Sequence, residues 1–269
     1  MERIKLILID IDDCLLPTEN QETENLGVGI DKIREYVKMT NEGKFPIIAF
    51  CTGRDRNYVE AVTFFTGRPN SWSVIESGIA LFNPTAKEPL LNPGLTPQIK
   101  EAFEEISRDR IPRVLKRYPG LYFYPGNMIN VALERKPGFE TPIEECYKMV
   151  RQELADLEAS GLIIIHHSQI AVDISPAGID KASGVRFLSQ HTGINFSQVL
   201  GIGDSRGDFP MLNLVGYIGC PVNASQECKE LIQAKGGYIS SFKHARGVAD
   251  VISHFVEEGQ NFSSSHYFY

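Results

Sequence analysis

The sequence predicts an α/β protein: a parallel sheet with helices on both faces and a second, α+β domain inserted into it. Short unbroken apolar runs alternate with segments of helical periodicity towards both ends of the chain. Strands that alternate with helices form parallel sheets, and unbroken apolar runs are typical of strands buried on both faces. Proline-rich sequence interrupts this alternation. We therefore expect a core domain of residues 1–82 and 178–269, with residues 83–177 inserted between its two parts.

The first part of the core begins with the apolar run Leu6-Ile7-Leu8-Ile9, which predicts a buried strand. Apolar residues then recur at helical spacing over 30–42, and Gly43 is placed to end that helix. The other elements predicted in this part are a strand at 45–51, a helix at about 55–65 and a strand at 73–75.

The inserted domain is predicted because proline-rich segments interrupt the alternation of strands and helices. Prolines punctuate a linker-like stretch from about residue 83, and Ser175-Pro176-Ala177-Gly178 is typical of a linker that returns the chain to the core. Between the two linkers we expect a helix at about 97–110, strands at 120–125 and 128–134, a helix at about 142–159, and strands at 162–166 and 170–174.

The second part of the core repeats the alternation of the first. Its clearest strand is the apolar run Val199-Leu200-Gly201-Ile202. Residues 259–269 show no periodicity, and we expect no regular structure there. The other predicted elements are helices at about 181–191, 208–214, 225–234 and 246–256, and a strand at 216–219.

Composition narrows the classes of function. The net charge of −7 disfavours a broad nucleic-acid-binding surface. The five cysteines show no CxxC spacing, which argues against a disulfide framework and a zinc site. We recognise no signal peptide, and no apolar run reaches the roughly 18 residues that a membrane helix needs. We expect a cytoplasmic protein without membrane association, and the sequence does not predict its oligomeric state.

Acidic residues gather where the first strand ends. Asp10-Ile11-Asp12-Asp13 places three carboxylates within four residues. Two carboxylates about 4 Å apart repel each other by about 4 kcal/mol at an effective dielectric constant of 20, and a bound cation relieves that repulsion. Oxygen ligands suit a hard ion such as Mg²⁺. The alternative is an ordinary exposed acidic turn.

Three further segments carry polar residues at the ends of predicted elements. Thr52-Gly53-Arg54 follows the second strand and resembles a phosphate site at a helix start, or a plain helix cap. Lys181 begins a predicted helix, where its charge opposes the helix dipole, and this unfavourable position hints at a functional role. The alternative is a solvated surface lysine. Asp204 and Asp208 follow the strand at 199–202, as a second acidic pair suited to a metal.

The order of these segments is more specific than any one of them. A carboxylate pair, a threonine, a lysine and a second carboxylate pair resemble the four motifs of the haloacid-dehalogenase-like (HAD) hydrolase superfamily. Here the motifs are DIDDC, CTGR, Lys181 and GDSRGD. The resemblance covers the expected core and implies a Rossmann-like fold. The position of the insertion is similar to that of a type IIB cap, as in sucrose-phosphate phosphatase-like and Cof-type phosphatases.

The resemblance implies a Mg²⁺-dependent phosphatase that acts on phosphomonoesters through a phosphoaspartate. Asp10 would be the nucleophile, and Asp12 would act as general acid and then as general base. Thr52 and Gly53 would hold phosphate oxygens, and Lys181 would neutralise charge on the transferred group. The Mg²⁺ would be held by the Asp10 side chain, the Asp12 carbonyl and Asp204, with Asp208 supporting from behind or through water.

The inserted cap would select the substrate, for which a small polar phosphomonoester, such as a sugar phosphate, is our working class. Asn127 and His166 are candidate contacts from the cap, and Arg54 is a candidate from the core. Tyr122 and Tyr124 could stack on the substrate. Each of these residues also has a simpler explanation, since 166–169 fits a hairpin turn and the two tyrosines fit one face of a strand.

Three departures from the family pattern keep alternatives open. Asp13-Cys14 replaces a Gly-Thr or Asn-Thr pair, Gly207 replaces an Asn, and Glu76-Ser77-Gly78 stands where Asn-Gly is frequent. One alternative is a phosphomannomutase-like phosphotransferase with the same core and cap type. Another is a catalytically idle, regulatory protein that binds sugar phosphates. A receiver domain also uses Asp, Thr, Lys and Mg²⁺, but the motif order and the inserted cap argue against it.

Overall fold

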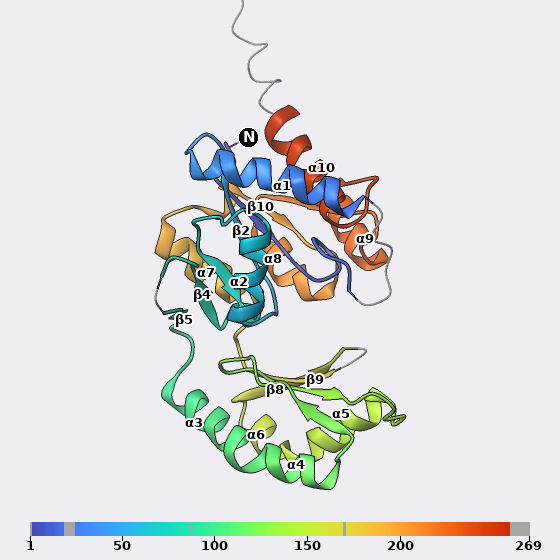
Figure 1. Cartoon of the computed structure of the whole chain (residues 1–269). Helices are drawn as coiled ribbons and strands as arrows, with labels where there is room; N and C mark the ends of the chain where they lie inside the picture. The colour runs from blue at the N-terminus through green and yellow to red at the C-terminus, as the bar shows by residue number, and fades with distance from the viewer. Residues whose placement is uncertain (1, 19–24, 87, 169–170, 259–269) are drawn as a thin grey trace, which may run out of the picture.

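The computed structural model describes residues 2–18, 25–86, 88–168 and 171–258. Two bodies lie one above the other (Figure 1), the upper built on a parallel sheet and the lower on an antiparallel sheet. This arrangement confirms the predicted α/β class with an inserted α+β segment. We call the upper body the core and the lower body the cap; the boundaries at residues 83 and 178 stay a prediction.

The core sheet is parallel throughout and has β1 near its centre. Ile9 at the end of β1 is in register with Ile202 on one side and Phe50 on the other. The residues that follow these three strands therefore emerge together at one edge. The sheet has the order β12-β11-β10-β1-β2, with β1 Leu6–Ile9, β2 Ile47–Phe50, β10 Val199–Ile202, β11 Tyr217–Cys220 and β12 Tyr238–Ile239.

Helices cover both faces of this sheet because alternate residues of β1 point to opposite sides. Ile7 and Ile9 belong to a buried cluster that includes residues of α1, α2 and α10. Leu6 and Leu8 belong to a second cluster with residues of α7, α8 and α9. The helix bounds are α1 Leu26–Asn41, α2 Arg56–Phe65, α7 Lys181–Thr192, α8 Phe209–Leu214, α9 Gln226–Ala234 and α10 His244–Ile252.

The third predicted strand was expected in the parallel sheet, but it pairs mainly with antiparallel neighbours. β3 (Ser73–Ile75) is the first strand of an antiparallel meander with β4 (Ala80–Phe82) and β5 (Leu90–Leu91). A single parallel bridge between Cys51 and Val74 connects it to the end of β2. The stretch expected to be a linker therefore contributes a short strand, β5.

The cap is a four-stranded antiparallel sheet with helices on the side away from the core (Figure 1). The apolar sides of its strands pack into one buried cluster with the cap helices. The opposite side of the sheet faces the core. The strand order is β6-β7-β9-β8, and the elements are α3 Pro97–Glu105, α4 Ile111–Arg117, β6 Leu121–Phe123, β7 Val131–Arg135, α5 Ile143–Glu153, α6 Ala155–Ala159, β8 Ile163–His167 and β9 Ala171–Pro176.

Several predicted boundaries in the cap were wrong. The helix expected to end at 110 continues to 117 through a π-helical turn at Ile106–Arg110. Pro112 explains this turn, because a proline ring clashes with the carbonyl four residues earlier and a widened turn relieves the clash. The helix expected over 142–159 is interrupted at Leu154, and β7 begins at Val131 rather than at 128.

The remaining elements agree with the prediction within a few residues. The strands at 6–9 and 199–202 have the predicted bounds, and α1 starts earlier than predicted, at Leu26. The residues 259–269 lie outside the described residues. Among the helices that the structure describes, none combines the length and the apolar character that crossing a membrane requires.

Candidate active site

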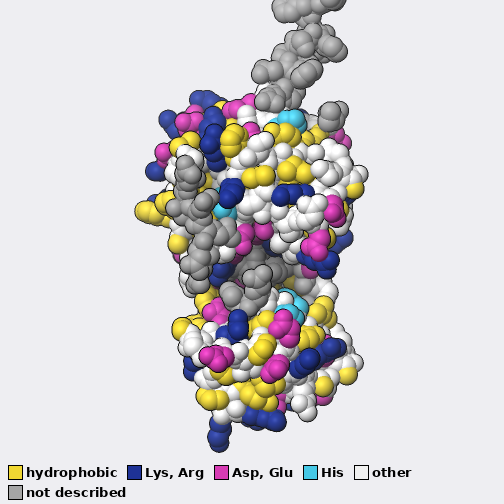
Figure 2. Space-filling view, turned by 90° about the vertical axis from the view of Figure 1, so that its right-hand side faces the viewer, with side chains coloured by type: hydrophobic (Ala, Val, Ile, Leu, Met, Phe, Trp, Pro, Cys, Tyr) yellow, Lys and Arg dark blue, Asp and Glu magenta, His cyan; other side chains and the backbone are white. Residues whose placement is uncertain are grey.

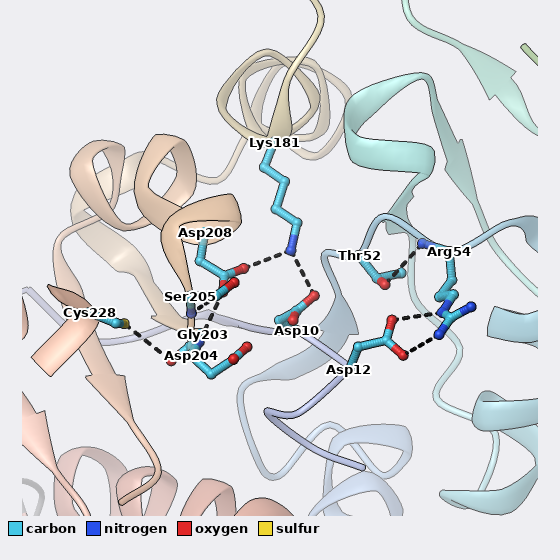
Figure 3. Close-up of polar contacts among 10 residues, drawn as sticks. All are labelled: Asp10, Asp12, Thr52, Arg54, Lys181, Gly203, Asp204, Ser205, Asp208 and Cys228. Atoms are coloured by element: carbon cyan, nitrogen blue, oxygen red, sulfur yellow. Dashed lines mark hydrogen bonds and ion pairs between the residues drawn. The ribbon is translucent and has the colours of Figure 1, made fainter. Parts of the chain in front are cut away.

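Asp10 is the first residue beyond β1, and it is buried with 5% of its surface exposed. Its backbone N–H donates to the carbonyl of Ile202 at 2.9 Å, which continues the sheet pairing and fixes the start of the loop. Lys181, at the first position of α7, reaches it from above (Figure 3). The Lys181 Nζ donates to Asp10 Oδ1 and to Asp208 Oδ1, both at 2.7 Å. The core places these three predicted residues in direct contact.

Both carboxylate oxygens of Asp208 accept hydrogen bonds from neighbouring groups. Its Oδ1 accepts from Lys181, and its Oδ2 accepts from the backbone N–H groups of Asp204 at 2.9 Å and Ser205 at 3.1 Å. Gly203 makes this approach possible, since a Cβ there would lie 2.4 Å from the Asp208 Cγ. Asp208 therefore orients the loop that carries Asp204 and shapes the site from behind.

The local charge balance is negative. Asp10, Asp204 and Asp208 each place a carboxylate oxygen within 4.8 Å of the others, and Lys181 is the cation bonded to two of them. Burial, followed by the charge of Asp208, raises the pKa of Asp10 to about 7. Burial, followed by the charge of Asp10, raises the pKa of Asp204 to about 9. Although burial opposes its charge, the carboxylates of Asp10 and Asp208 hold the pKa of Lys181 well above its usual value.

These carboxylates fit a divalent cation. Within the described part of the chain, no side-chain or backbone donor reaches the carboxylate of Asp204, which is only 8% exposed. A buried carboxylate without a donor is costly, and a hard cation with oxygen ligands would satisfy it. Asp10 and Asp204 could bind such an ion directly, and Asp208 would support them.

Thr52 and Arg54 lie beyond the neighbouring strand, β2. Thr52 is fully buried, and its hydroxyl accepts from the Arg54 backbone N–H at 3.1 Å. The Arg54 side chain, expected to meet substrate, instead binds the Asp12 carboxylate (Figure 3). Two hydrogen bonds of 2.8 Å join its Nε and Nη2 to the two Asp12 oxygens. The Asp12 side chain thus points away from the carboxylate cluster, and its carboxylate is not among the candidate metal ligands of the described residues.

The cap turns a polar sheet face towards this edge of the core. His166 in β8 is paired with Asp173 in β9, and Tyr122 in β6 with Glu134 in β7, so these side chains share one face. Burial raises the pKa of Asp173, while the charge of His166 lowers it. Asp and Glu side chains lie on both sides of the waist between the two bodies (Figure 2). His166 lies within β8, which agrees with the strand predicted at 162–166 and not with the alternative of a turn at that position.

A family model described as haloacid dehalogenase-like hydrolase matches residues 132–252. The chain is 25% identical over 254 residues to a phosphoglycolate phosphatase of Sulfolobus acidocaldarius, covering 94% of this chain and 97% of that protein. It is 31% identical to a phosphoglycolate phosphatase of Thermoplasma volcanium over 101 residues, 38% of this chain. That match and the one to the Methanothermobacter thermautotrophicus enzyme span 43% and 45% of those proteins, less than half of each.

The family match and the full-length relative both make the chain similar to haloacid dehalogenase-like hydrolases. Solved structures of this family share its fold. The sucrose-phosphatase of Synechocystis, solved with sucrose and phosphate, superposes with a TM-score of 0.65 at 20% identity, covering 94% of this chain and 98% of that one. A haloacid dehalogenase-like hydrolase of Bacteroides thetaiotaomicron has a TM-score of 0.63 at 16% identity, covering 94% and 100%. The relatives' names support the prediction of a phosphatase.

The HAD-like core also receives contacts that the sequence did not predict. Asp55, the N-cap of α2, accepts a hydrogen bond of 2.6 Å from the Tyr124 hydroxyl of the cap. Glu76 accepts three backbone N–H groups of the cap, from residues 128–130. Glu76 had been noted only as a departure from the family pattern. An acid within an apolar run, as Asp173 is in β9, was a sequence signal available for the cap face.

Proposed function

We propose that this chain is a Mg²⁺-dependent phosphomonoesterase that forms a phosphoaspartate at Asp10. The observation that carries the proposal is the buried contact of Asp10 with Lys181, beside Asp204 and Asp208. A carboxylate at a strand end, next to a cation and a candidate metal site, is suited to attack a phosphorus atom whose negative charge is neutralised.

In the first step, an Asp10 carboxylate oxygen attacks phosphorus while the bond from phosphorus to the leaving oxygen breaks. Lys181 is placed to stabilise charge on the phosphoryl oxygens, since its Nζ already lies 2.7 Å from the nucleophile. Thr52, buried at the end of β2, would hold a phosphate oxygen through its hydroxyl. The leaving oxygen takes a proton from Asp12.

In the second step, Asp12 removes a proton from water, the water oxygen attacks phosphorus, and the Asp10–phosphorus bond breaks. Phosphate leaves and Asp10 is restored. Arg54 holds the Asp12 carboxylate through two hydrogen bonds of 2.8 Å. The pair must open for Asp12 to carry the proton of the first step, so Arg54 controls the availability of the acid. When bound, Mg²⁺ would supply positive charge next to the phosphoryl oxygens, held by Asp10, the Asp12 carbonyl and Asp204.

The cap face favours a leaving group rich in hydroxyls. Glu134, Asp173 and His166 offer acceptors on the sheet face towards the core, and hydroxyls of a sugar are donors to such groups. The carboxylate of a substrate such as phosphoglycolate would lie on the same side as Glu134 and Asp173, whose negative charges would repel it. We therefore propose a sugar phosphate or a similar polyol phosphate as substrate, with Asn127 and His166 as contacts from the cap.

The test is phosphate release from a panel of sugar phosphates, polyol phosphates and phosphoglycolate, with Mg²⁺ and with excess chelator. We expect release only with Mg²⁺, and a higher kcat/KM for polyol phosphates than for phosphoglycolate. Folded protein that releases no phosphate in either condition would contradict the proposal. An isomeric sugar phosphate with little free phosphate would instead indicate a mutase.

Asp10→Asn gives a first prediction within that test. The amide cannot attack phosphorus, so we expect turnover to fall below detection. The amide is close in size to the carboxylate, so circular dichroism and the melting temperature should show a folded protein. Trapping of radioactive phosphate on the wild-type chain, and not on the variant, checks the phosphoaspartate. Turnover retained by the variant would remove Asp10 from the mechanism.

A further inference from the structure

Glu76 is a buried acid of the core, and its carboxylate accepts hydrogen bonds from the cap. It follows β3, is fully buried and adopts a φ of 45°. Its carboxylate accepts the backbone N–H of Met128 at 2.6 Å, of Ile129 at 3.1 Å and of Asn130 at 3.3 Å. The Asn130 side chain also donates to the Glu76 carbonyl at 3.0 Å. Four hydrogen bonds therefore join one core residue to three consecutive cap residues.

The turn that carries Glu76 is also fixed to the catalytic segments. The backbone N–H of Glu76 donates to the Arg54 carbonyl at 3.0 Å, and that of Ser77 donates to the Thr52 carbonyl at 2.9 Å. On its other side, Gly78 lies against Asp180, where a Cβ would come within 2.1 Å of the carbonyl oxygen. The turn thus touches both the phosphate-site threonine and the start of the helix that presents Lys181.

The cap segment is held at both ends. Tyr124 binds Asp55 at 2.6 Å, and residues 128–130 bind Glu76. Asn127 lies between these two anchors, next to the first N–H that Glu76 accepts. Hydrogen bonds to a charged carboxylate are among the stronger ones in proteins, so the Glu76 anchor sets the position of this segment more firmly than neutral contacts would.

We propose that Glu76 is the positioning residue that docks cap residues 128–130 on the core and thereby presents Asn127 to the substrate. The catalytic part of this proposal rests on the phosphatase function proposed above, while the docking part does not. Glu76 contacts neither substrate nor reacting atoms. It acts through the cap backbone, and its effect should appear for substrates that use the cap.

The first test is amide hydrogen exchange on the full-length Glu76→Gln variant, followed by mass spectrometry. Glutamine keeps the size but removes the charge and points an N–H₂ group at backbone donors. We expect the amides of 128–130 to exchange about tenfold faster, the scale of one charged hydrogen bond. Peptides of β1 should keep their protection, which shows an intact core. Glu101→Gln, an exposed acid on a cap helix, is the matched control and should change nothing.

The second test separates positioning from general support of the core. We compare kcat and KM for a sugar phosphate and for acetyl phosphate, whose small leaving group needs no cap contact. In Glu76→Gln the KM for the sugar phosphate should rise about tenfold, while kcat/KM for acetyl phosphate stays within about twofold. Equal losses for both substrates would overturn the positioning role.

Unchanged exchange at 128–130 in a folded variant would overturn the docking itself. Should Glu76→Gln not fold, Glu76→Asp keeps the charge but withdraws the carboxylate by one methylene, and the same faster exchange is expected. A wild-type chain that hydrolyses neither substrate would contradict the phosphatase proposal, and the exchange result would still decide the docking.

Discussion

At the scale of single residues, Lys181 is the side chain on which the charge balance of the site depends. It is 7% exposed and bonded to two carboxylates that are themselves buried. Removing one partner of a buried pair leaves the other charge uncompensated, which is far more costly than losing a surface pair. The lysine at the start of α7 should therefore stabilise the fold in addition to its proposed role in catalysis.

Lys181→Met should lower the free energy of unfolding by about 3 kcal/mol at neutral pH without added metal. Without the ammonium, Asp10 and Asp208 face each other, and the folded state binds protons more tightly than the unfolded chain. A folded state that binds more protons loses stability as pH rises. Wild type already binds the Asp10 proton below about pH 7, so the additional loss in the variant should grow as pH rises above about 7, and urea unfolding at several pH values measures it.

Lys148→Met is the control, because Lys148 is exposed on α5. We expect its unfolding free energy to stay within about 0.5 kcal/mol of wild type at every pH. A loss in Lys181→Met that is equal at all pH values would contradict the electrostatic explanation.

The candidate site also shows what residue patterns can and cannot predict. Asp10, Lys181 and Asp208 follow strand ends or begin a helix, and parallel strands bring such positions to one edge. The sequence therefore predicts their meeting. The pairing of Arg54 with Asp12 and the docking of Glu76 depend on side-chain direction and on the placement of the cap, which no local pattern encodes.

At the scale of elements, the packing of α1 against α10 depends on one glycine. A Cβ on Gly29 would lie 2.2 Å from the backbone nitrogen of Arg246, so the two helices touch backbone to backbone at this point. Gly29→Ala should lower the free energy of unfolding by at least about 2 kcal/mol, although alanine favours helices by about 1 kcal/mol. Thermal unfolding measures the loss.

Gly27→Ala, on the same helix, is the matched control. A Cβ at Gly27 would meet no atom within 4 Å, so alanine should leave stability unchanged or raise it by up to about 1 kcal/mol. If both variants were stabilised, α1 and α10 would not be in backbone contact as described.

Element prediction succeeded where burial alone decides the structure. The runs at 6–9 and 199–202 are buried on both faces, and their bounds are those predicted. Element prediction failed where contacts between distant parts of the chain outweighed the local sequence pattern. Pro112 predicts the end of a helix, but a π-helical turn accommodates it, and Ser73–Ile75 pairs with a strand inside the expected linker. Neither solution leaves a periodic signal.

At the scale of the whole molecule, the acidic cluster links folding to metal binding. Asp10 lies 194 residues before Asp204 in the chain, so its oxygens approach those of Asp204 and Asp208 only in the folded state. A ligand that binds only the folded state stabilises it in proportion to the logarithm of its concentration. Mg²⁺ should therefore raise the free energy of unfolding, by about 2.7 kcal/mol at one hundred times its Kd.

The variant that tests this linkage is Asp204→Asn. Its amide removes a charge that no donor within the described residues satisfies, so without metal the variant should be at least as stable as wild type. With Mg²⁺ it should gain little, because a principal ligand is lost. Asp31→Asn, a change at an exposed acid on α1, should keep the full gain. Melting temperatures with chelator and with increasing Mg²⁺ measure the stability without metal and the gain from Mg²⁺. They are compared for wild type, Asp204→Asn and Asp31→Asn. An equal gain for Asp204→Asn and wild type would place the stabilising metal elsewhere, and the electrostatic argument for this cluster as the Mg²⁺ site would fail.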